Sequence, residues 1–144
     1  MIKLHKLLKL VNSINCIRAG VTAGSFFLYI MESEIKPWGS YEVLHEDSTC
    51  KVKKLTVKPG QRLSLQYHYK RQEHWICVAG AGEVYLNGQT GVIQPHDAIF
   101  VQYHANHQLS NPSETEDLVI IETQVGEYFG EDDIVRLEDP YNRE

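Results

Sequence analysis

Cysteines are few in this chain, and none of them has a partner at a metal-binding spacing. The 144 residues contain three cysteines, Cys16, Cys50 and Cys77, which form no CxxC pair and leave one over from any pairing. This pattern favours a reducing compartment over a disulfide scaffold. The sequence also contains no apolar run long enough to span a membrane. We therefore expect a cytoplasmic protein with no membrane partner.

Basic residues are in the minority. The chain has 14 Lys and Arg against 19 Asp and Glu, which gives a formal net charge of −5 at pH 7. Proteins that bind nucleic acids or anionic membranes in a general way normally present a basic face to the phosphates. The composition argues against both roles, so we predict no nucleic-acid partner. The length suits one ordinary domain with one principal site.

Acidic residues are absent from the first 31 residues. That segment has four basic residues, so residues 32–144, with ten basic and nineteen acidic residues, carry a formal charge of −9. One helical stripe of the segment is apolar and has lysines beside it: Leu4, Leu7, Leu8 and Val11. A targeting peptide is one interpretation of such a stretch. The interpretation we favour is a leader or accessory segment at residues 1–30, followed by a single domain at residues 31–144.

Long segments with a helical period are lacking after Pro37. The sequence shows short apolar and β-branched runs instead, separated by turn signals such as Pro59-Gly60 and Asn87-Gly88. The predicted strands cover residues 40–46, 51–57, 63–69, 74–80, 82–88, 90–94, 98–102, 107–111 and 117–124. Strands this short and regular predict an all-β sandwich or small barrel. We expect the acidic tail at 126–144 to add a turn or a short helix.

Polar and apolar side chains alternate through residues 61–69. Because alternate residues of a strand face the same way, Gln66 and His68 are predicted to project together. Ser64 and Arg62 are predicted to continue that face. For this strand taken alone, contact with solvent is the simpler explanation of a polar face.

Two residues outside that strand favour a buried site. Glu73 follows after a short link, and His107 lies beyond the strand predicted at 98–102. Together with Gln66 and His68, they form a nitrogen and oxygen ligand set suited to one divalent first-row metal ion. These residue types do not distinguish zinc, manganese, iron, cobalt or nickel.

These residues also match a known pattern. The spacing Gly60-x5-Gln66-x-His68-x4-Glu73-x6-Gly80 resembles the first cupin motif, and His107 with Asn111 resembles the end of the second. The segments KPWGSYEVL, KVKKLTVKPGQRLSLQYH, EHW, HQLSNP and GEYFGEDDIVRLEDPY are similar to the type II phosphomannose isomerase cupin. The resemblance covers roughly residues 36–143. It implies a cupin double-stranded β-helix, a jelly-roll barrel with a metal inside.

The chain departs from that family at several positions. Gln66 stands where the first motif usually has a histidine, and His96, Gln102 and His104 stand where the second usually has Gly, Pro and Gly. A turn that needs a positive φ loses stability when its glycine is replaced. We expect His96 and His104 in surface turns, with His104 as an additional candidate ligand. The family usually carries a guanylyltransferase half, and its Gly-rich nucleotide-binding start is not found here, so we predict no nucleotidyl transfer.

The activity implied by the resemblance is the reversible conversion of mannose 6-phosphate into fructose 6-phosphate. This conversion needs a base that moves a proton between C2 and C1, and an electrophile that stabilises charge on the substrate oxygens. The metal would supply the electrophile. The candidate catalytic residues are Glu73 and His68, and the candidate metal ligands are Gln66, His68, Glu73 and His107. The candidate phosphate-binding residues are Arg62 first, then Arg71 and Lys54.

Other classes of function stay open. A metal-bound cupin without its usual partner domain could bind sugar phosphates without turning them over. The same barrel could instead act on another carbohydrate, or perform a metal-dependent oxygenation. The three classes differ in whether they exchange protons with water and whether they consume oxygen. A homodimer is a further expectation, because cupins often pair.

Overall fold

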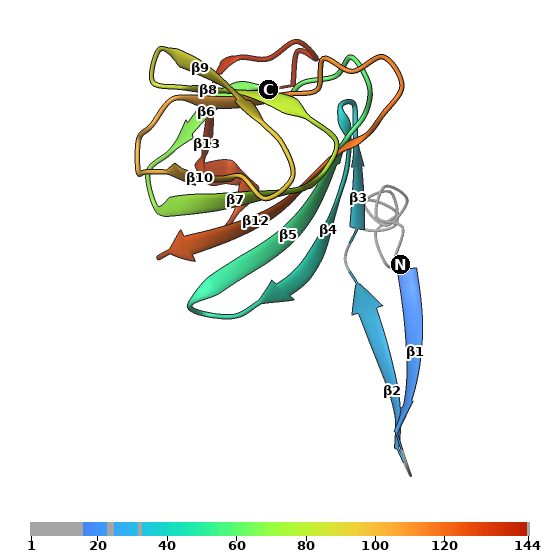
Figure 1. Cartoon of the computed structure of the whole chain (residues 1–144). Coiled ribbons are helices and arrows are strands. Elements are labelled where there is room, and N and C mark those ends of the chain that lie inside the picture. The colour runs from blue at the N-terminus through green and yellow to red at the C-terminus, as the bar shows by residue number, and fades with distance from the viewer. Residues whose placement is uncertain (1–15, 23–24, 32, 144) are drawn as a thin grey trace, which may run out of the picture.

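The computed structural model describes residues 16–22, 25–31 and 33–143. Its main body consists of two antiparallel sheets that face each other around a barrel interior (Figure 1). The first sheet has the strand order β10-β7-β12-β5-β4-β3, and the second has the order β13-β6-β11-β8-β9. The first contains β3 (Ser33–Lys36), β4 (Gly39–Glu46), β5 (Cys50–Val57), β7 (Arg71–Ala79), β10 (Ala98–Val101) and β12 (Leu118–Gly126). The second contains β6 (Leu65–His68), β8 (Gly82–Leu86), β9 (Gln89–Ile93), β11 (His107–Ser110) and β13 (Ile134–Glu138). The all-β prediction is confirmed.

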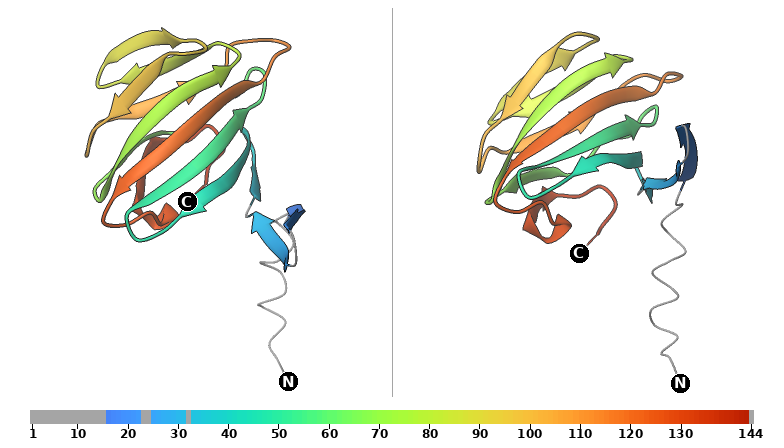
Figure 2. Two further views of the ribbon diagram at one scale, coloured as in Figure 1. Left: turned by 60° about the horizontal axis from the view of Figure 1, so that its bottom comes forward. Right: turned by 90° about the horizontal axis from the view of Figure 1, so that it is seen from below.

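The inward face of β12 shows how the barrel interior is divided. This strand lies between β5 and β7 (Figure 2), and every second residue from Leu118 to Gln124 is buried. The buried residues are apolar at the start of the strand, at Leu118 and Ile120, and polar further along, at Glu122 and Gln124. β12 pairs in register with β5 and β7, so this change from apolar to polar residues continues across the neighbouring strands. One end of the barrel interior is therefore an apolar core, and the other end is polar.

The apolar end supplies the stability of the barrel. Its best-buried side chains, each 1% exposed or less, include Val57, Trp75, Ile93, Leu109, Leu118 and Ile120. Full burial of one such side chain contributes roughly 1.5–3 kcal/mol. This core holds the strands in register, and the polar residues at the other end are positioned by it.

The C-terminal tail contains a strand that the sequence did not predict. After a short 3₁₀ helix at Glu131–Asp133, β13 pairs with β6 at the edge of the second sheet. Position 134 lies opposite His68, and Arg136 lies opposite Gln66. The expectation of only a turn or a short helix was therefore wrong in part. The added strand brings an arginine to the face of the sheet that carries the candidate metal ligands.

Two paired strands precede the barrel, at residues 16–22 and 25–31. β1 (Cys16–Thr22) pairs with β2 (Ser25–Met31) in a separate two-stranded sheet, which extends from the barrel in Figure 1. The helical stripe predicted at Leu4 to Val11 lies outside the described residues. The boundary between a leader or accessory segment at residues 1–30 and a domain at residues 31–144 stays a prediction. Within the described part of the chain, no helix is long and apolar enough to cross a membrane.

Two of the unusual histidines occupy the turns expected for them. His96 and His104 are exposed and have φ values of 81° and 60°, in the left-handed region that glycine adopts without strain. The ring of His104 packs against the ring of Tyr69, and only the backbone N–H of His104 reaches a buried histidine, at the carbonyl oxygen of His68. The expected surface-turn placement is confirmed, and His104 does not join the candidate ligands.

Replacing His96 with glycine should stabilise the protein. Left-handed backbone costs a residue with a Cβ about 1–2 kcal/mol, whereas glycine loses roughly 0.5–1 kcal/mol more backbone entropy on folding. We expect His96→Gly to raise the free energy of unfolding by up to about 1 kcal/mol in urea unfolding. Gln102→Gly is the control, because Gln102 has no positive φ, and it should give no gain. Equal effects of the two changes would contradict this explanation.

Candidate metal centre and substrate pocket

Three of the predicted ligands come together inside the barrel. His68 ends β6, Glu73 lies in β7 and His107 begins β11, and each residue is 1–2% exposed. One nitrogen from each histidine and one carboxylate oxygen from Glu73 lie within 4.8 Å of one another. The two imidazole rings are 4.9 Å apart between centroids. The solvent-exposed explanation of this polar face is therefore wrong for His68.

Glu73 is held by four neighbouring donors. Its Oε1 accepts hydrogen bonds from Arg71 Nε at 3.1 Å and Gln124 Nε2 at 3.3 Å, and it lies 3.0 Å from His68 Nε2. Its Oε2 accepts a hydrogen bond from Trp75 Nε1 at 3.1 Å. These contacts fix the carboxylate in one orientation.

The charge state of this cluster follows from its surroundings. Burial raises the pKa of Glu73, but the hydrogen bond from His68 and the nearby positive charges outweigh burial and hold that pKa below its ordinary range. Burial lowers the pKa of His107, although the charge of Glu73 opposes this effect. An ionised carboxylate and a neutral imidazole are the protonation states that a metal ion requires of its ligands.

The orientation of His107 supports a metal ligand. Its Nδ1 donates a hydrogen bond to the carbonyl oxygen of Ala105 at 2.8 Å, which leaves the lone pair on Nε2. That Nε2 is buried, has no hydrogen-bond partner among the described residues, and lies 3.7 Å from Glu73 Oε2. A buried imidazole nitrogen without a partner is costly unless a further group binds it. Two imidazoles and a carboxylate therefore fit a divalent first-row metal ion.

Gln66 lies on the same inward face but has a partner already. It is 9% exposed, its backbone is opposite His107 across β6 and β11, and its Oε1 accepts a hydrogen bond from the hydroxyl of Ser64 at 2.8 Å. The structure thus places Gln66 beside the three other predicted ligands. Its role as a fourth ligand stays a prediction.

The predicted phosphate-binding residues are separated by the fold. Arg71 is 1% exposed and lines the pocket, whereas Arg62 is exposed. The prediction that Arg62 shares the face of His68 was wrong. The regular strand begins at Leu65, and strict alternation is lost before it, where Leu63 and Ser64 are both buried. Lys54 lies on the outer side of β5, 3.4 Å from Glu42, while Lys53 points inward.

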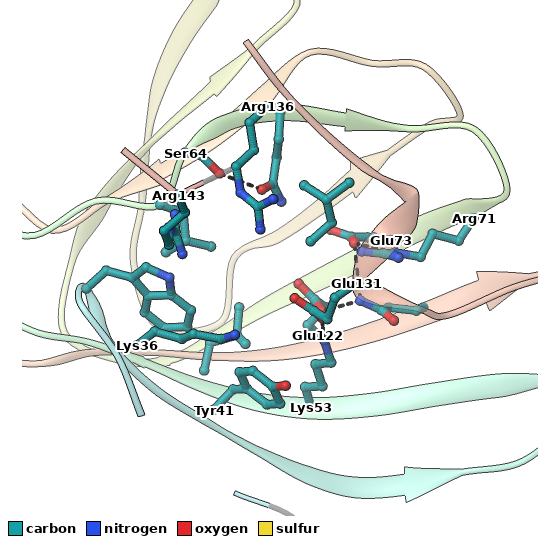
Figure 3. A pocket seen from close by; sticks show the side chains of 16 residues that line it. Lys36, Tyr41, Lys53, Ser64, Arg71, Glu73, Glu122, Glu131, Arg136 and Arg143 are labelled. Atoms are coloured by element: carbon teal, nitrogen blue, oxygen red, sulfur yellow. Dashed lines mark hydrogen bonds and ion pairs between the residues drawn. The ribbon is translucent and has the colours of Figure 1, made fainter. Parts of the chain in front are cut away.

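A pocket opens beside the cluster, and sequence reasoning missed most of its charged residues (Figure 3). The empty space of the pocket amounts to about 440 Å³, part of which is open to solvent. Its charged lining residues are Lys36, Lys53, Arg71, Glu73, Glu122, Glu131, Arg136 and Arg143. The signal that could have found two of them is period-two alternation. It places Lys53 on the face of Leu55, and Glu122 on the face of Ile120.

Glu122 differs from the other carboxylates of this pocket. Lys53 is bound to Glu131 at 2.6 Å, whereas Glu122 accepts a hydrogen bond from Gln124 at 2.7 Å. Glu122 is 5% exposed. Burial and the negative charge of Glu73 raise the pKa of Glu122 to about 8, although Lys53 opposes this shift. The pocket thus holds one carboxyl that can gain or lose a proton near neutral pH.

The fold and the buried cluster define the class of protein. Facing antiparallel sheets around a polar interior form the double-stranded β-helix of cupins. A solved cupin-2 domain protein from Rhodospirillum rubrum superimposes with a TM-score of 0.57 at 19% identity, over 65% of this chain and 67% of that one. The chain has the cupin fold.

The sequence comparisons identify the family within this class. Residues 29–139 match the family described as Mannose-6-phosphate isomerase C-terminal, so the chain belongs to that family. It is 45% identical over 108 residues to the alginate biosynthesis protein AlgA of Pseudomonas aeruginosa. It is 42% identical over 108 residues to the mannose-1-phosphate guanylyltransferase ManC of Salmonella typhimurium. Each match takes in 75% of this chain and 22% of the relative.

Proposed function

We propose that this protein interconverts mannose 6-phosphate and fructose 6-phosphate by proton transfer through an enediol. The observation that carries the proposal is one pocket that is lined both by Glu73, the carboxylate of the candidate metal cluster, and by a separate carboxyl, Glu122, whose pKa is raised to about 8. Membership in a family described by this isomerase supports the same substrate pair.

His68, Glu73 and His107 would hold one divalent metal ion, with Gln66 as a candidate fourth ligand. Such an ion, when bound, polarises the oxygens of the sugar and stabilises their negative charge. Arg71 and Trp75 hold Glu73 in the orientation that the cluster requires, through their hydrogen bonds to its two oxygens. The His68 and Glu73 pair is thereby assigned to binding the ion.

Glu122 is assigned the proton transfer. Four donors surround the Glu73 carboxylate and stabilise its charged form, so Glu73 is a weak base. The Glu122 carboxylate would take the proton from C2 of the aldose and return it to C1, while the proton of the C2 hydroxyl moves to the C1 oxygen, which yields the ketose through the enediol. A carboxyl whose pKa lies close to the working pH suits both halves of this transfer. The buried Lys53 beside it keeps positive charge near the deprotonated form.

A turnover assay on the full chain tests this proposal. We expect the protein restored with a divalent metal to form fructose 6-phosphate from mannose 6-phosphate, and a chelator to stop the reaction until metal is returned. Binding of the sugar phosphate without turnover would contradict the proposal in favour of a binding module. Consumption of oxygen would contradict it in favour of an oxygenase.

A homodimer also stays a prediction. The outer face of the six-stranded sheet carries exposed Ile76, Val78 and Phe100, which are 41–48% exposed. This apolar surface would support pairing of two copies. Analytical ultracentrifugation of the full chain would distinguish a dimer from a monomer.

A further inference from the structure

One side of the pocket is positively charged and lies apart from the metal cluster. Figure 3 shows Arg136, Arg143 and Lys36 on one side of the pocket and Arg71, Glu73 and Glu131 on the other. The complete lining contains five lysines and arginines against three glutamates. On the side of Arg71, the carboxylates have cationic partners, as in the contacts of Glu73 with Arg71 and of Glu131 with Lys53. On the other side, the charged residues that line the pocket are all cations, namely Arg136, Arg143 and Lys36.

Arg136 is the cation on that side without a partner. Its Nε is shielded from solvent and makes no hydrogen bond, and no hydrogen bond or ion pair joins its side chain to any other residue that the structure describes. Its neighbours are already paired: Arg143 with Asp139 at 2.9 Å, and Lys36 with Glu34 at 2.7 Å. Shielding a guanidinium nitrogen without a hydrogen bond is costly, so an anion in the pocket would relieve that cost.

We propose that Arg136, with Arg143 and Lys36 beside it, binds the phosphate group of the sugar substrate. The identity of the sugar rests on the proposed function, but the N–H donors of these residues indicate by themselves that the ligand group is a phosphate. A planar guanidinium presents paired N–H groups that match two phosphate oxygens. Arg143 and Lys36 add further N–H donors beside it, although each of them already has a carboxylate partner. At a partly buried position the unpaired charge of Arg136 acts more strongly than in bulk water.

The strand order supports placing the phosphate there. His107, Gln66 and Arg136 are cross-strand neighbours on β11, β6 and β13, with Gln66 in the middle. Two strand spacings separate the outer pair by about 10 Å between backbones. In a hexose 6-phosphate, the phosphate and the reacting C1 and C2 atoms lie at opposite ends of the carbon chain. A substrate spanning these strands would therefore place C1 and C2 at the metal cluster and the phosphate at Arg136.

Calorimetric binding of inorganic phosphate, mannose 6-phosphate and unphosphorylated mannose to the full chain tests this inference. We expect Arg136→Ala to weaken the binding of both phosphates at least tenfold and to leave the binding of mannose unchanged. Arg136→Lys should weaken phosphate binding less than Arg136→Ala does, because lysine keeps the positive charge but lacks the paired N–H donors. Arg143→Ala should weaken phosphate binding less than Arg136→Ala does. Arg62→Ala is the matched control, because Arg62 is exposed outside the pocket, and it should leave all three affinities unchanged.

The outcomes separate this inference from the proposed function. Phosphate binding that depends on Arg136, in a protein without isomerase turnover, would uphold the phosphate site and overturn the function. Turnover with a KM for mannose 6-phosphate that Arg136→Ala does not change would uphold the function and overturn the phosphate site. The phosphate site is also overturned if the native chain binds no phosphate, or if Arg62→Ala weakens binding as much as Arg136→Ala. Thermal unfolding of each folded variant shows that the changes in affinity do not arise from loss of the fold.

Discussion

His107→Ala should remove the bound metal and the activity together. His107 directs a buried, unpartnered Nε2 toward Glu73, so its loss leaves the ion with one imidazole and one carboxylate among the three clustered ligands. Changing a group that merely orients a ligand costs about 10–100-fold in metal affinity or activity. We therefore expect more than about 100-fold weaker metal binding, measured by competition with a chelator, and a matching loss of turnover.

His74→Ala is the matched control for that experiment. His74 follows Glu73 directly but points to the opposite face of β7, where it is exposed and its ring stacks on Phe100 with centroids 4.6 Å apart. Its removal should leave the metal content unchanged. If the His107→Ala protein is folded and keeps its full metal content, the assignment of the cluster is wrong.

Glu122→Gln should stop turnover while leaving the metal bound. The glutamine has nearly the same shape and can still accept the hydrogen bond from Gln124, but it cannot take up a proton. General acid–base catalysis contributes about 10²–10⁴-fold, so we expect a loss of kcat in that range. The metal affinity and the Kd for mannose 6-phosphate should stay within threefold of the native values. Glu83→Gln, at an exposed position on β8, is the control and should be fully active.

The pH dependence of the native protein gives a second measurement of the same role. The pKa of Glu122 is raised to about 8, so its basic form becomes more populated as the pH rises through that value. A nearby metal ion favours the charged form and moves the transition toward neutral pH. We expect kcat/KM to rise with pH up to about 8 and then to level off. In Glu122→Gln the residual rate should lose this rise, and an unchanged profile would show that another group takes the proton.

The fold could be predicted because local signals repeat along the chain. Glycine and proline turns and short alternating runs marked nearly every strand from β4 to β12. β13 was missed because its five residues lie in an acidic tail, and its place is set by pairing with β6, far away in sequence. The alternation of polar and apolar residues does not indicate which distant strand pairs at the edge of a sheet.

The candidate site could be predicted only in part. His68, Glu73 and His107 were found by spacing, and the structure brings them together. Arg62 was wrongly placed because alternation was counted across residues that precede the regular strand. Lys53 was available from the same rule, since it shares a face with the buried Leu55. The position of Arg136 in the pocket could not be predicted, because it depends on the unpredicted strand.

Isomerisation through an enediol is tested most directly by running the reaction in D₂O with the metal-restored full chain. We expect fructose 6-phosphate that carries deuterium at C1 where the transferred proton has exchanged with solvent, and no product after chelation. The proposed isomerisation would be contradicted if a folded, metal-loaded protein forms no fructose 6-phosphate and leaves no deuterium at C2 of the recovered mannose 6-phosphate.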